Sequence, residues 1–447
     1  MTLWGTAELS LDTAIVEFTV GDDPRLDLEL LPYDCLASAA HARMLCSIGV
    51  LSEEELTQLI GGLRNAYKLA CQQSLPIHLD DEDGHTALEK FLTKATGDAG
   101  KAIHTGRSRN DQVIMAMRLL LRHRLVILGE DIGLLTEQLI TLVDHHRQVL
   151  MPGYTHTRQA MPSTVGQLFM SVAEGLLRDL ETLRLPLQHA NRCALGSASG
   201  YGVPLPLDRQ QVADQLGLDA VDVNTLHVQN SRGRLEATTL FALHQMSQTL
   251  GRLATDLINF SSEAYGFFRL PEELTTGSSI MPNKRNPDVL ELVRAQPSAQ
   301  LGRYTTVSTL LQGLGGGYHR DLQRTKEPVL SGLREAKHVV AIMRHTVDRI
   351  EVDRTRCEAA LEPGIFATDR AYDLVRTGMP FRDAYQQIKG EGSGTYPHAM
   401  VLHNRTHLGA PGTPQAQSLR VELKRCRDAL LPFAQGHAQA ELVLIQD

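Results

Sequence analysis

The chain lacks most features that mark a membrane, secreted or nucleic-acid-binding protein. It has one Trp and 5% aromatic residues in 447, so its core must be built from Leu, Ala, Val, Ile and Met. No apolar run approaches the ~18 residues of a membrane-spanning helix, and no charged segment precedes an apolar stretch at the N-terminus. The formal net charge is −8, without the clustered Lys and Arg that nucleic-acid binding requires. We therefore expect a soluble, cytoplasmic protein that binds neither membranes nor nucleic acid.

Cysteine is scarce, and the spacings of common metal and cofactor sites are missing. No two cysteines form a C-x-x-C pair, which favours free thiols in a reducing compartment over a disulfide framework. No P-loop, G-x-G-x-x-G, H-E-x-x-H or G-x-S-x-G sequence occurs. We therefore expect neither a metal nor an organic cofactor. The six cysteines are Cys35, Cys46, Cys71, Cys193, Cys357 and Cys426.

Helical periodicity dominates the sequence. One heptad seam has steps of four and three between apolar residues, and a second has Thr239 at its single polar position. Other runs lie at about 164–187, 288–311 and 324–350. Helices of this length cannot bury their apolar stripes alone, so we predict an all-α fold with a long central helical bundle, and a homo-oligomer. The first seam is Leu121, Leu125, Leu128, Ile132, Leu135, Leu139 and Leu142; the second is Leu235, Ala242, Met246, Leu250, Leu253, Leu257 and Phe260.

The predicted helices group into three domains. We expect a smaller N-terminal helical domain at 1–107, the central helical bundle at 108–352, and a smaller C-terminal helical domain at 353–447. Polar or glycine-rich connections at 104–111, 151–157, 195–204, 275–287 and 313–320 separate the helices. Loops on a rigid scaffold commonly carry binding and catalytic residues, so these connections are the candidate sites.

The most informative connection is the loop Gly277-Ser-Ser-Ile-Met-Pro-Asn-Lys-Arg-Asn-Pro287. It offers a hydroxyl at Ser278, a cation at Lys284 and an amide at Asn286, and Asp288 is expected to cap the helix that follows. The loop would then lie at a helix N-terminus, where backbone N–H groups and the helix dipole favour carboxylates. The same field would help Ser278 to lose its proton. The plainer alternative is a Gly/Ser/Pro surface loop.

A second candidate is His156, which follows Tyr154 and Thr155 ahead of a helix that we expect to enter near Pro162. A loop His beside a helix start can act as a general acid or base near pH 7. Taken alone, one of eighteen histidines is more often an ordinary polar residue.

Two more clusters open helices. The run 107–111 contains Arg107, Ser108 and Arg109, whose guanidiniums can bind a carboxylate in bidentate fashion; the alternative is that Asn110 or Asp111 is only an N-cap. The run from Tyr318 to Lys326 places several donors in one and a half turns. Hydroxyls, amides, cations and one His together fit proton abstraction beside a carboxylate, with the resulting charge held by fixed donors.

These stretches resemble a known family. The loop 277–287 looks like the signature loop of the fumarase/aspartase superfamily, and the stretches 100–112, 151–162 and 317–326 resemble those of the argininosuccinate lyases within it. The similarity spans roughly residues 30 to 390 in consistent order. It implies a mostly helical homotetramer in which each active site gathers loops from three chains. It also implies the reversible elimination of argininosuccinate to arginine and fumarate, without a cofactor.

The resemblance also implies roles for individual residues. Ser278 and His156 are the proton-transfer pair, with Glu291 raising the basicity of His156. Lys284 and Asn286 hold the carboxylate whose charge doubles in the intermediate. The residues implied to bind the fumarate half are Ser108, Arg109, Asn110 and Thr155, and those toward the arginine half are Tyr318, Gln323 and Lys326.

One stretch differs from the family pattern. Gly21 stands where many of these lyases carry a Ser that touches the amino-acid end of the substrate, which leaves Asp22 and Asp23 as candidates for binding the α-amino group. A sister lyase that releases fumarate from another N-succinyl amine is therefore one alternative function. A catalytically silent structural protein, of the kind found among lens crystallins, is the other.

Overall fold

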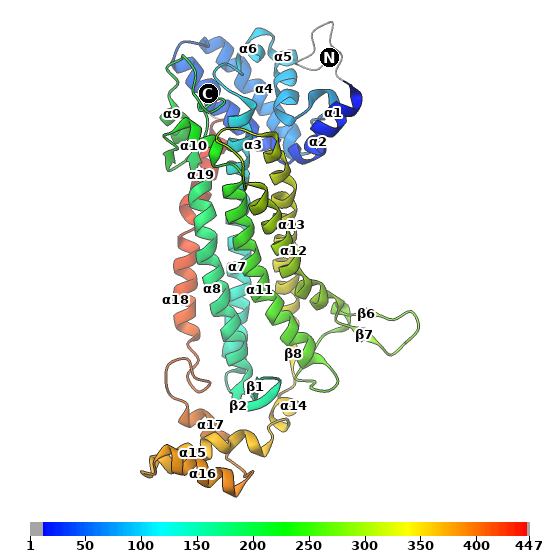
Figure 1. The fold of residues 1–447 in the computed structure, drawn as a ribbon, viewed down its shortest axis with the longest axis vertical. Helices are drawn as coiled ribbons and strands as arrows, with labels where there is room; N and C mark the ends of the chain where they lie inside the picture. The colour runs from blue at the N-terminus through cyan, green and yellow to red at the C-terminus, as the bar shows by residue number, and fades with distance from the viewer. Residues whose placement is uncertain (1–11, 445–447) are drawn as a thin grey trace.

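A computed structural model describes residues 12–444. Its centre is a bundle of five long helices, and shorter helices cover both ends (Figure 1). The all-α architecture that the periodicity predicts is confirmed. The bundle helices are α7 (Arg109–His146), α8 (Val165–Ala190), α11 (Arg234–Ser261), α12 (Asp288–Leu310) and α13 (Lys326–Val347).

The two predicted heptad seams lie inside this bundle. On α7, Leu121, Leu125 and Leu135 are completely buried, and on α11 Leu250 and Leu257 are too. Helix α7 packs against α8 and α13, while α11 packs against α8 and α12. Burial of one apolar side chain contributes roughly 1.5–3 kcal/mol, so the six buried residues of the α7 seam stabilise the bundle far more than helix propensity does.

The N-terminal part consists of helices that cover one end of the bundle. There α3 packs on α7 and α4, and α5 packs on α4 and α6. A capping box at Ser52 and Glu55 begins α4, which satisfies two backbone N–H groups that the helix itself cannot. The helices are α1 (Thr13–Val20), α2 (Asp23–Asp27), α3 (Leu31–Ser47), α4 (Glu53–Cys71), α5 (Gly84–Thr96) and α6 (Asp98–Ala102); α9 (Arg209–Gln215) and α10 (Thr225–Asn230) lie at the same end (Figure 1).

The C-terminal part divides in space. The helices α14 (Arg354–Ala359), α15 (Ala367–Arg376), α16 (Phe381–Glu391) and α17 (His398–Asn404) form the far end of the molecule, whereas α18 (Ala416–Asp428) and α19 (Leu431–Leu442) return along α7 (Figure 1). Fully buried Arg122 of α7 fixes this return, because it donates to the carbonyl oxygens of Gly217 and Gly436 at 2.7 and 2.9 Å. The division of the chain at residues 107 and 352 stays a prediction.

The described residues contain four small two-stranded sheets that periodicity did not predict. The largest is the hairpin at 150–164, so the helix that we expected near Pro162 begins instead at Val165, where Thr164 accepts the N–H of Gln167. Pro152 pairs with Pro162 in this hairpin, and neither can donate to a ladder. The pairs are β1 (Leu150–Thr155) with β2 (Arg158–Thr164), β3 (Arg192–Cys193) with β4 (Ala220–Val221), β5 (Phe268–Arg269) with β8 (Glu351–Val352), and β6 (Thr276–Gly277) with β7 (Arg285–Asn286).

One buried carboxylate weakens the bundle at neutral pH. Asp179 of α8 is 6% exposed, and its Oδ2 has no hydrogen-bond partner among residues 12–444. Burial raises the pKa of Asp179 to about 6, and Thr249 of α11 offsets this only in part. Because the folded pKa lies above the unfolded value near 3.9, the folded state is destabilised as the pH rises from about 4 to about 6, and it stays so above that range.

We therefore predict that Asp179→Asn stabilises the fold. The gain in free energy of unfolding should be on the order of 3 kcal/mol at pH 8 and roughly half of that at pH 5. Urea denaturation at both pH values measures it, with Asp144→Asn, on the half-exposed surface of α7, as the control. An equal gain at both pH values, or a loss, would contradict the explanation.

Candidate active site

The signature loop 277–287 stands away from the bundle between α11 and α12 (Figure 1). Its base is closed by the short antiparallel ladder of β6 and β7. Ser278 is half-buried, and its Oγ accepts the backbone N–H groups of Ile280 and Met281 at 3.3 and 3.2 Å. Two donated N–H groups stabilise a hydroxyl oxygen that gains negative charge. The Ser278 hydroxyl is therefore in surroundings that suit a proton acceptor.

The loop runs into the N-terminus of α12, as predicted, but Asp288 is not its cap. Pro287 occupies the cap position, Asp288 is the first helical residue, and its side chain accepts a hydrogen bond from the hydroxyl of Thr276. The loop geometry explains the difference, since the ladder carries Thr276 back to α12. Lys284 is exposed, and Glu291 lies in the first turn of α12, 3.7 Å from Arg294.

The predicted acid or base His156 lies at the tip of the β1–β2 hairpin. His156 and Thr157 have φ values of +53° and +59°, a left-handed conformation that costs on the order of 1 kcal/mol for residues with a Cβ. Thr155 and His156 are both exposed. The hairpin rests on Tyr154, whose ring lies 5.8 Å from that of Tyr265 near the end of α11.

The third cluster is the beginning of α7. Ser108, rather than Asn110 or Asp111, is the N-cap, and Asp111 completes a capping box with it. The other oxygen of Asp111 accepts the N–H groups of Gly196 and Ala198 at 3.1 and 2.8 Å, and burial raises the pKa of Asp111 to about 6. Asp111 thus fixes the loop at 195–200 against the residues predicted to bind the fumarate half.

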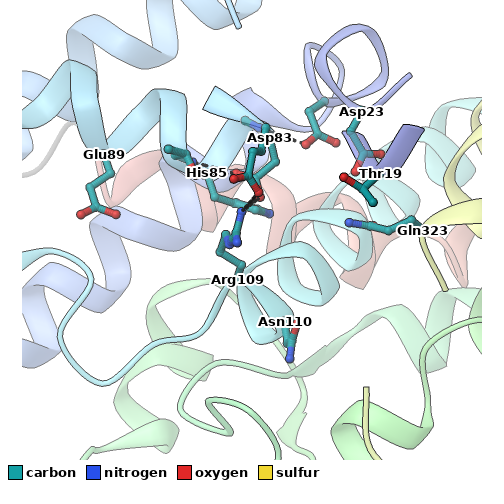
Figure 2. Close-up of polar contacts among 12 residues, drawn as sticks. Thr19, Asp23, Asp83, His85, Glu89, Arg109, Asn110 and Gln323 are labelled. Atoms are coloured by element: carbon teal, nitrogen blue, oxygen red, sulfur yellow. Dashed lines mark hydrogen bonds and ion pairs between the residues drawn. The ribbon is translucent and has the colours of Figure 1, made fainter. Parts of the chain in front are cut away.

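Arg109 projects from this helix start toward two acids. Its Nη1 lies 2.9 Å from Asp83 (Figure 2) and 3.2 Å from Glu82. Because the side chain remains 23% exposed, the two carboxylates orient the guanidinium without enclosing it.

The run 318–326 lies beside the same helix start. It does not open one continuous helix as predicted: residues Arg320–Thr325 form a 3₁₀ turn, and α13 begins at Lys326. The Oε1 of Gln323 accepts a hydrogen bond of 2.8 Å from Arg232, whose guanidinium also lies 5.6 Å from the centre of the Tyr318 ring. These contacts hold Tyr318 and Gln323 in one cluster.

Lys326 differs from the other predicted binding residues because it is only 1% exposed. Its ammonium lies 3.1 Å from Asp23 and 2.7 Å from Asp27. Burial lowers and the two carboxylates raise the pKa of Lys326, with a net upward shift, so the lysine stays charged. Its charge is therefore used within the protein, to hold α2 against the start of α13.

Sequence reasoning missed Thr19, Asp83 and His85, which the fold brings to this end. They lie around Arg109, Asn110 and Gln323 together with Asp23, which the sequence analysis named as a candidate for binding the α-amino group (Figure 2). Thr19 is tied to the cluster by Arg320, which donates to its carbonyl oxygen at 2.6 Å. Thr19 thus brings a hydroxyl to the end of the molecule where Gly21 left one missing. Only tertiary structure could show this, because α1 and Gln323 are some 300 residues apart.

His85 and Asp34 form a buried ion pair, with 2.7 Å between Nδ1 and Oδ2. Burial lowers the pKa of His85, Asp34 raises it, and the net shift is upward; burial raises the pKa of Asp34, His85 lowers it, and the net shift is downward. Each group therefore favours the charged form of the other. The sequence carries no signal for this pair, since Asp34 and His85 lie 51 residues apart and the acidic run at 80–83 contains neither.

The clusters that carry the predicted site residues do not all meet within one chain. Ser108 stands at one end of α7 and His156 beyond the other, and a helix of 38 residues at 1.5 Å per residue is about 57 Å long. Similarly, the 23 residues of α12 put about 35 Å between the signature loop and the run that begins at Tyr318. A proton-transfer pair works at hydrogen-bond distances from its substrate. One chain alone therefore cannot bring Ser278, His156 and Arg109 to one substrate.

Comparison with known proteins agrees with the sequence motifs. Residues 12–300 match a protein-family model described as "Lyase". An argininosuccinate lyase of Sorangium cellulosum is 44% identical over 93% of this chain and 96% of its own, and one of Thermotoga neapolitana is 41% identical over 85% of this chain and 95% of its own. A crystal structure of EDDS lyase in complex with formate aligns with a TM-score of 0.80 at 24% identity, covering 98% of this chain and 95% of that one.

Proposed function

This chain belongs to the argininosuccinate lyase family, and we propose from this that it catalyses the reversible elimination of L-argininosuccinate to L-arginine and fumarate. It is a lyase that breaks a C–N bond. We place the reaction in arginine biosynthesis in the cytoplasm, in keeping with six cysteines that are all free thiols. No helix within residues 12–444 is both long and apolar enough to span a membrane.

The observation that carries the mechanism is the position of Ser278 on an exposed loop that leads into the N-terminus of α12. Ser278 removes the proton from the carbon beside a succinyl carboxylate, and the electron pair moves into that carboxylate. Lys284 and Asn286 hold the doubly charged group that results. One well-placed donor of this kind lowers the activation barrier by ~3–4 kcal/mol, and this step therefore depends on the loop.

The intermediate then collapses. Its electron pair forms the double bond of fumarate, and the bond to the substrate nitrogen breaks. His156 delivers a proton to the departing nitrogen, through a water molecule, and Glu291 raises the basicity of His156. Since Glu291 and His156 lie on different clusters of one chain, we assign their contact to different subunits.

The substrate binds at the end of the bundle where α7 begins. Ser108, Arg109 and Asn110 hold the fumarate half together with Thr155 of another subunit, and Tyr318 and Gln323 face the arginine half. Lys326 acts through Asp23: a buried ammonium would repel a guanidinium, whereas the Asp23 carboxylate attracts the cationic groups of arginine. Thr19 supplies a hydroxyl to the amino-acid end.

We propose a homotetramer, in which the separated clusters of different subunits meet. The support lies in α12, whose Leu292 and Leu301 are 69% and 46% exposed in the single chain, and in Phe241 of α11 at 41%. Large apolar side chains exposed along neighbouring helices indicate an interaction surface. Close packing of a second bundle against this face would cover them.

The direct test is to mix purified protein with argininosuccinate and follow fumarate by its ultraviolet absorbance. We expect fumarate to appear together with an equal amount of arginine. If no fumarate formed, the proposed substrate would be wrong, and a screen of other N-succinyl amines would separate a sister lyase from a silent structural protein.

Thr19 allows a separate test of the arginine side. Thr19→Val removes the hydroxyl but keeps the shape, and we expect KM for argininosuccinate to rise about five- to tenfold, the value of one hydrogen bond, with kcat little changed. Thr19→Ser, which keeps the hydroxyl, is the matched control and should retain the original KM. Equal KM values for the two variants would remove Thr19 from the site.

A further inference from the structure

A cleft on the side of the bundle lies outside the proposed active site. It is formed where α3, α7 and α13 meet, has a volume of about 330 Å³, and is lined among others by Glu29, His123, Arg124, Arg334, Lys337 and His338. Arg124 is fifteen residues along α7 from Arg109, which corresponds to about 22 Å. No residue assigned above to catalysis or substrate binding lines the cleft.

The cleft carries more positive than negative charge. Arg124 contacts Glu29 at 2.5 Å, and Arg334 contacts the other oxygen of the same carboxylate. Lys337 is exposed and forms no ion pair with any residue between 12 and 444. Three cations thus face one carboxylate, a local excess of two charges in a chain whose formal net charge is −8.

The two arginines also carry N–H donors that Glu29 does not use. Each directs one Nη1 at Glu29, and a guanidinium has five N–H donors. Arg124 and Arg334 remain 28% and 39% exposed, so part of each guanidinium can be reached from solvent. Planar guanidiniums bind carboxylates and phosphates in bidentate fashion.

One wall of the cleft is held in place by ring stacking and a hydrogen bond. The ring of His123 stacks on that of His437 at 3.8 Å, and its Nδ1 lies 2.9 Å from the hydroxyl of Tyr33. Burial lowers the pKa of His123. Burial, and in second place the neighbouring His123, lower the pKa of His437 to about 3, so both rings are neutral. They order the wall beside Arg124 and add no charge to the cleft.

We propose that this cleft binds a small dianion, a dicarboxylate or a phosphate group, between Arg334, Lys337 and Arg124. A dianion matches the excess of two positive charges that Glu29 leaves. The ligand competes with Glu29 for the guanidiniums, so its binding loosens the contact of Glu29 with α7 and α13.

The cleft is connected to the proposed arginine side of the active site. Glu29 follows Asp27 by two residues, and Asp27 with Asp23 holds Lys326 at the start of α13. Ion pairs therefore hold the segment 23–29 against α13 at two places, at Lys326 and, two turns later, at Arg334. Loss of the Arg334–Glu29 ion pair shifts the segment that presents Asp23, and this shift changes KM for the substrate. This last step rests on the proposed function.

Binding is tested first, on the full chain and without substrate. Inorganic phosphate and succinate are added separately at constant ionic strength, and thermal unfolding is followed. We expect a saturable rise in Tm on the order of 2 °C with at least one of them, and which one works identifies the kind of anion. The rise should be lost in Lys337→Glu and kept in Lys94→Ala, which removes an exposed lysine of α5 outside the cleft.

No saturable rise with either anion, or the same rise in Lys337→Glu as in the unmodified protein, would overturn the site. The kinetic arm then measures KM for argininosuccinate with and without the effective anion. We expect KM to change at least twofold in the unmodified protein and in Lys94→Ala, but not in Lys337→Glu. Binding without any change in KM would overturn the coupling, and absence of lyase activity would reject the proposed function while leaving the binding result intact.

Discussion

Ser278→Ala lowers kcat on the order of 10³-fold, the usual contribution of a positioned general base, and leaves folding and assembly unchanged. Ser278 is half-buried in an exposed loop, and its hydroxyl contacts only backbone N–H groups of that loop. Its removal therefore leaves no cavity in the core and no unpaired charge. The loss should appear in kcat, with KM changed much less, because the proposed role of Ser278 is to remove the proton.

The matched control is Ser279→Ala, which removes the neighbouring hydroxyl from the same loop. We expect it to reduce kcat far less, since Ser279 accepts neither of the two N–H groups that converge on Ser278. Circular dichroism and size-exclusion chromatography check that both variants fold and assemble. Retained turnover in Ser278→Ala, or an equal loss in both variants, would take Ser278 out of the proton-transfer role.

Lys326→Ala lowers the free energy of unfolding by about 3–5 kcal/mol, because it leaves the buried carboxylates of Asp23 and Asp27 without a counter-charge. Asp23 and Asp27 are 4% and 1% exposed, and the lysine is the cation that lies between them. Burial, with Lys326 opposing it, already raises the pKa of Asp23 above its ordinary value. The loss should thus be largest at neutral pH and shrink as the pH falls, when the stranded carboxylates take up protons.

Urea denaturation at pH 7 and pH 5 measures this loss. Lys101→Ala is the control, since Lys101 pairs with Asp98 at 2.7 Å and both side chains are largely exposed, and an exposed pair contributes only about 0–1 kcal/mol. Equal losses in the two variants would show that Lys326 is not the buried cation described here.

The sequence predicts the long helices well because a heptad seam is a local pattern. Leu121 to Leu139 on α7 and Leu250 to Leu257 on α11 are buried where the spacing puts them. The hairpin at 150–164 was missed because Pro152 and Pro162 read as a loop, whereas tertiary contacts with Tyr265 hold it as strands. Helix starts differ from the sequence analysis by one or a few residues: Pro287 rather than Asp288 is the N-cap of α12, and Ser108 rather than Asn110 or Asp111 is the N-cap of α7.

The candidate site is predictable only as a set of loops. Ser278, His156 and Arg109 were predicted from their residue types and their motifs. The distances between their clusters follow only from the bounds of α7 and α12 in the structure. Thr19, Asp23 and His85 carry no motif, and they reach Arg109 and Gln323 through tertiary folding (Figure 2). In the proposed homotetramer the three clusters meet across subunits, and no pattern within one chain encodes that meeting.

The central claim, that each active site takes Ser278 and His156 from different chains, is tested most directly by mixing inactive subunits. Ser278→Ala and His156→Ala chains are co-expressed, and the lyase activity of the mixed oligomer is measured beside each variant alone. With random assembly, about one site in four should receive both intact residues, so activity should return to roughly a quarter of the unmodified level. Activity no higher than that of the separate variants, in an oligomer shown to contain both chains, would mean that each site is built within one chain.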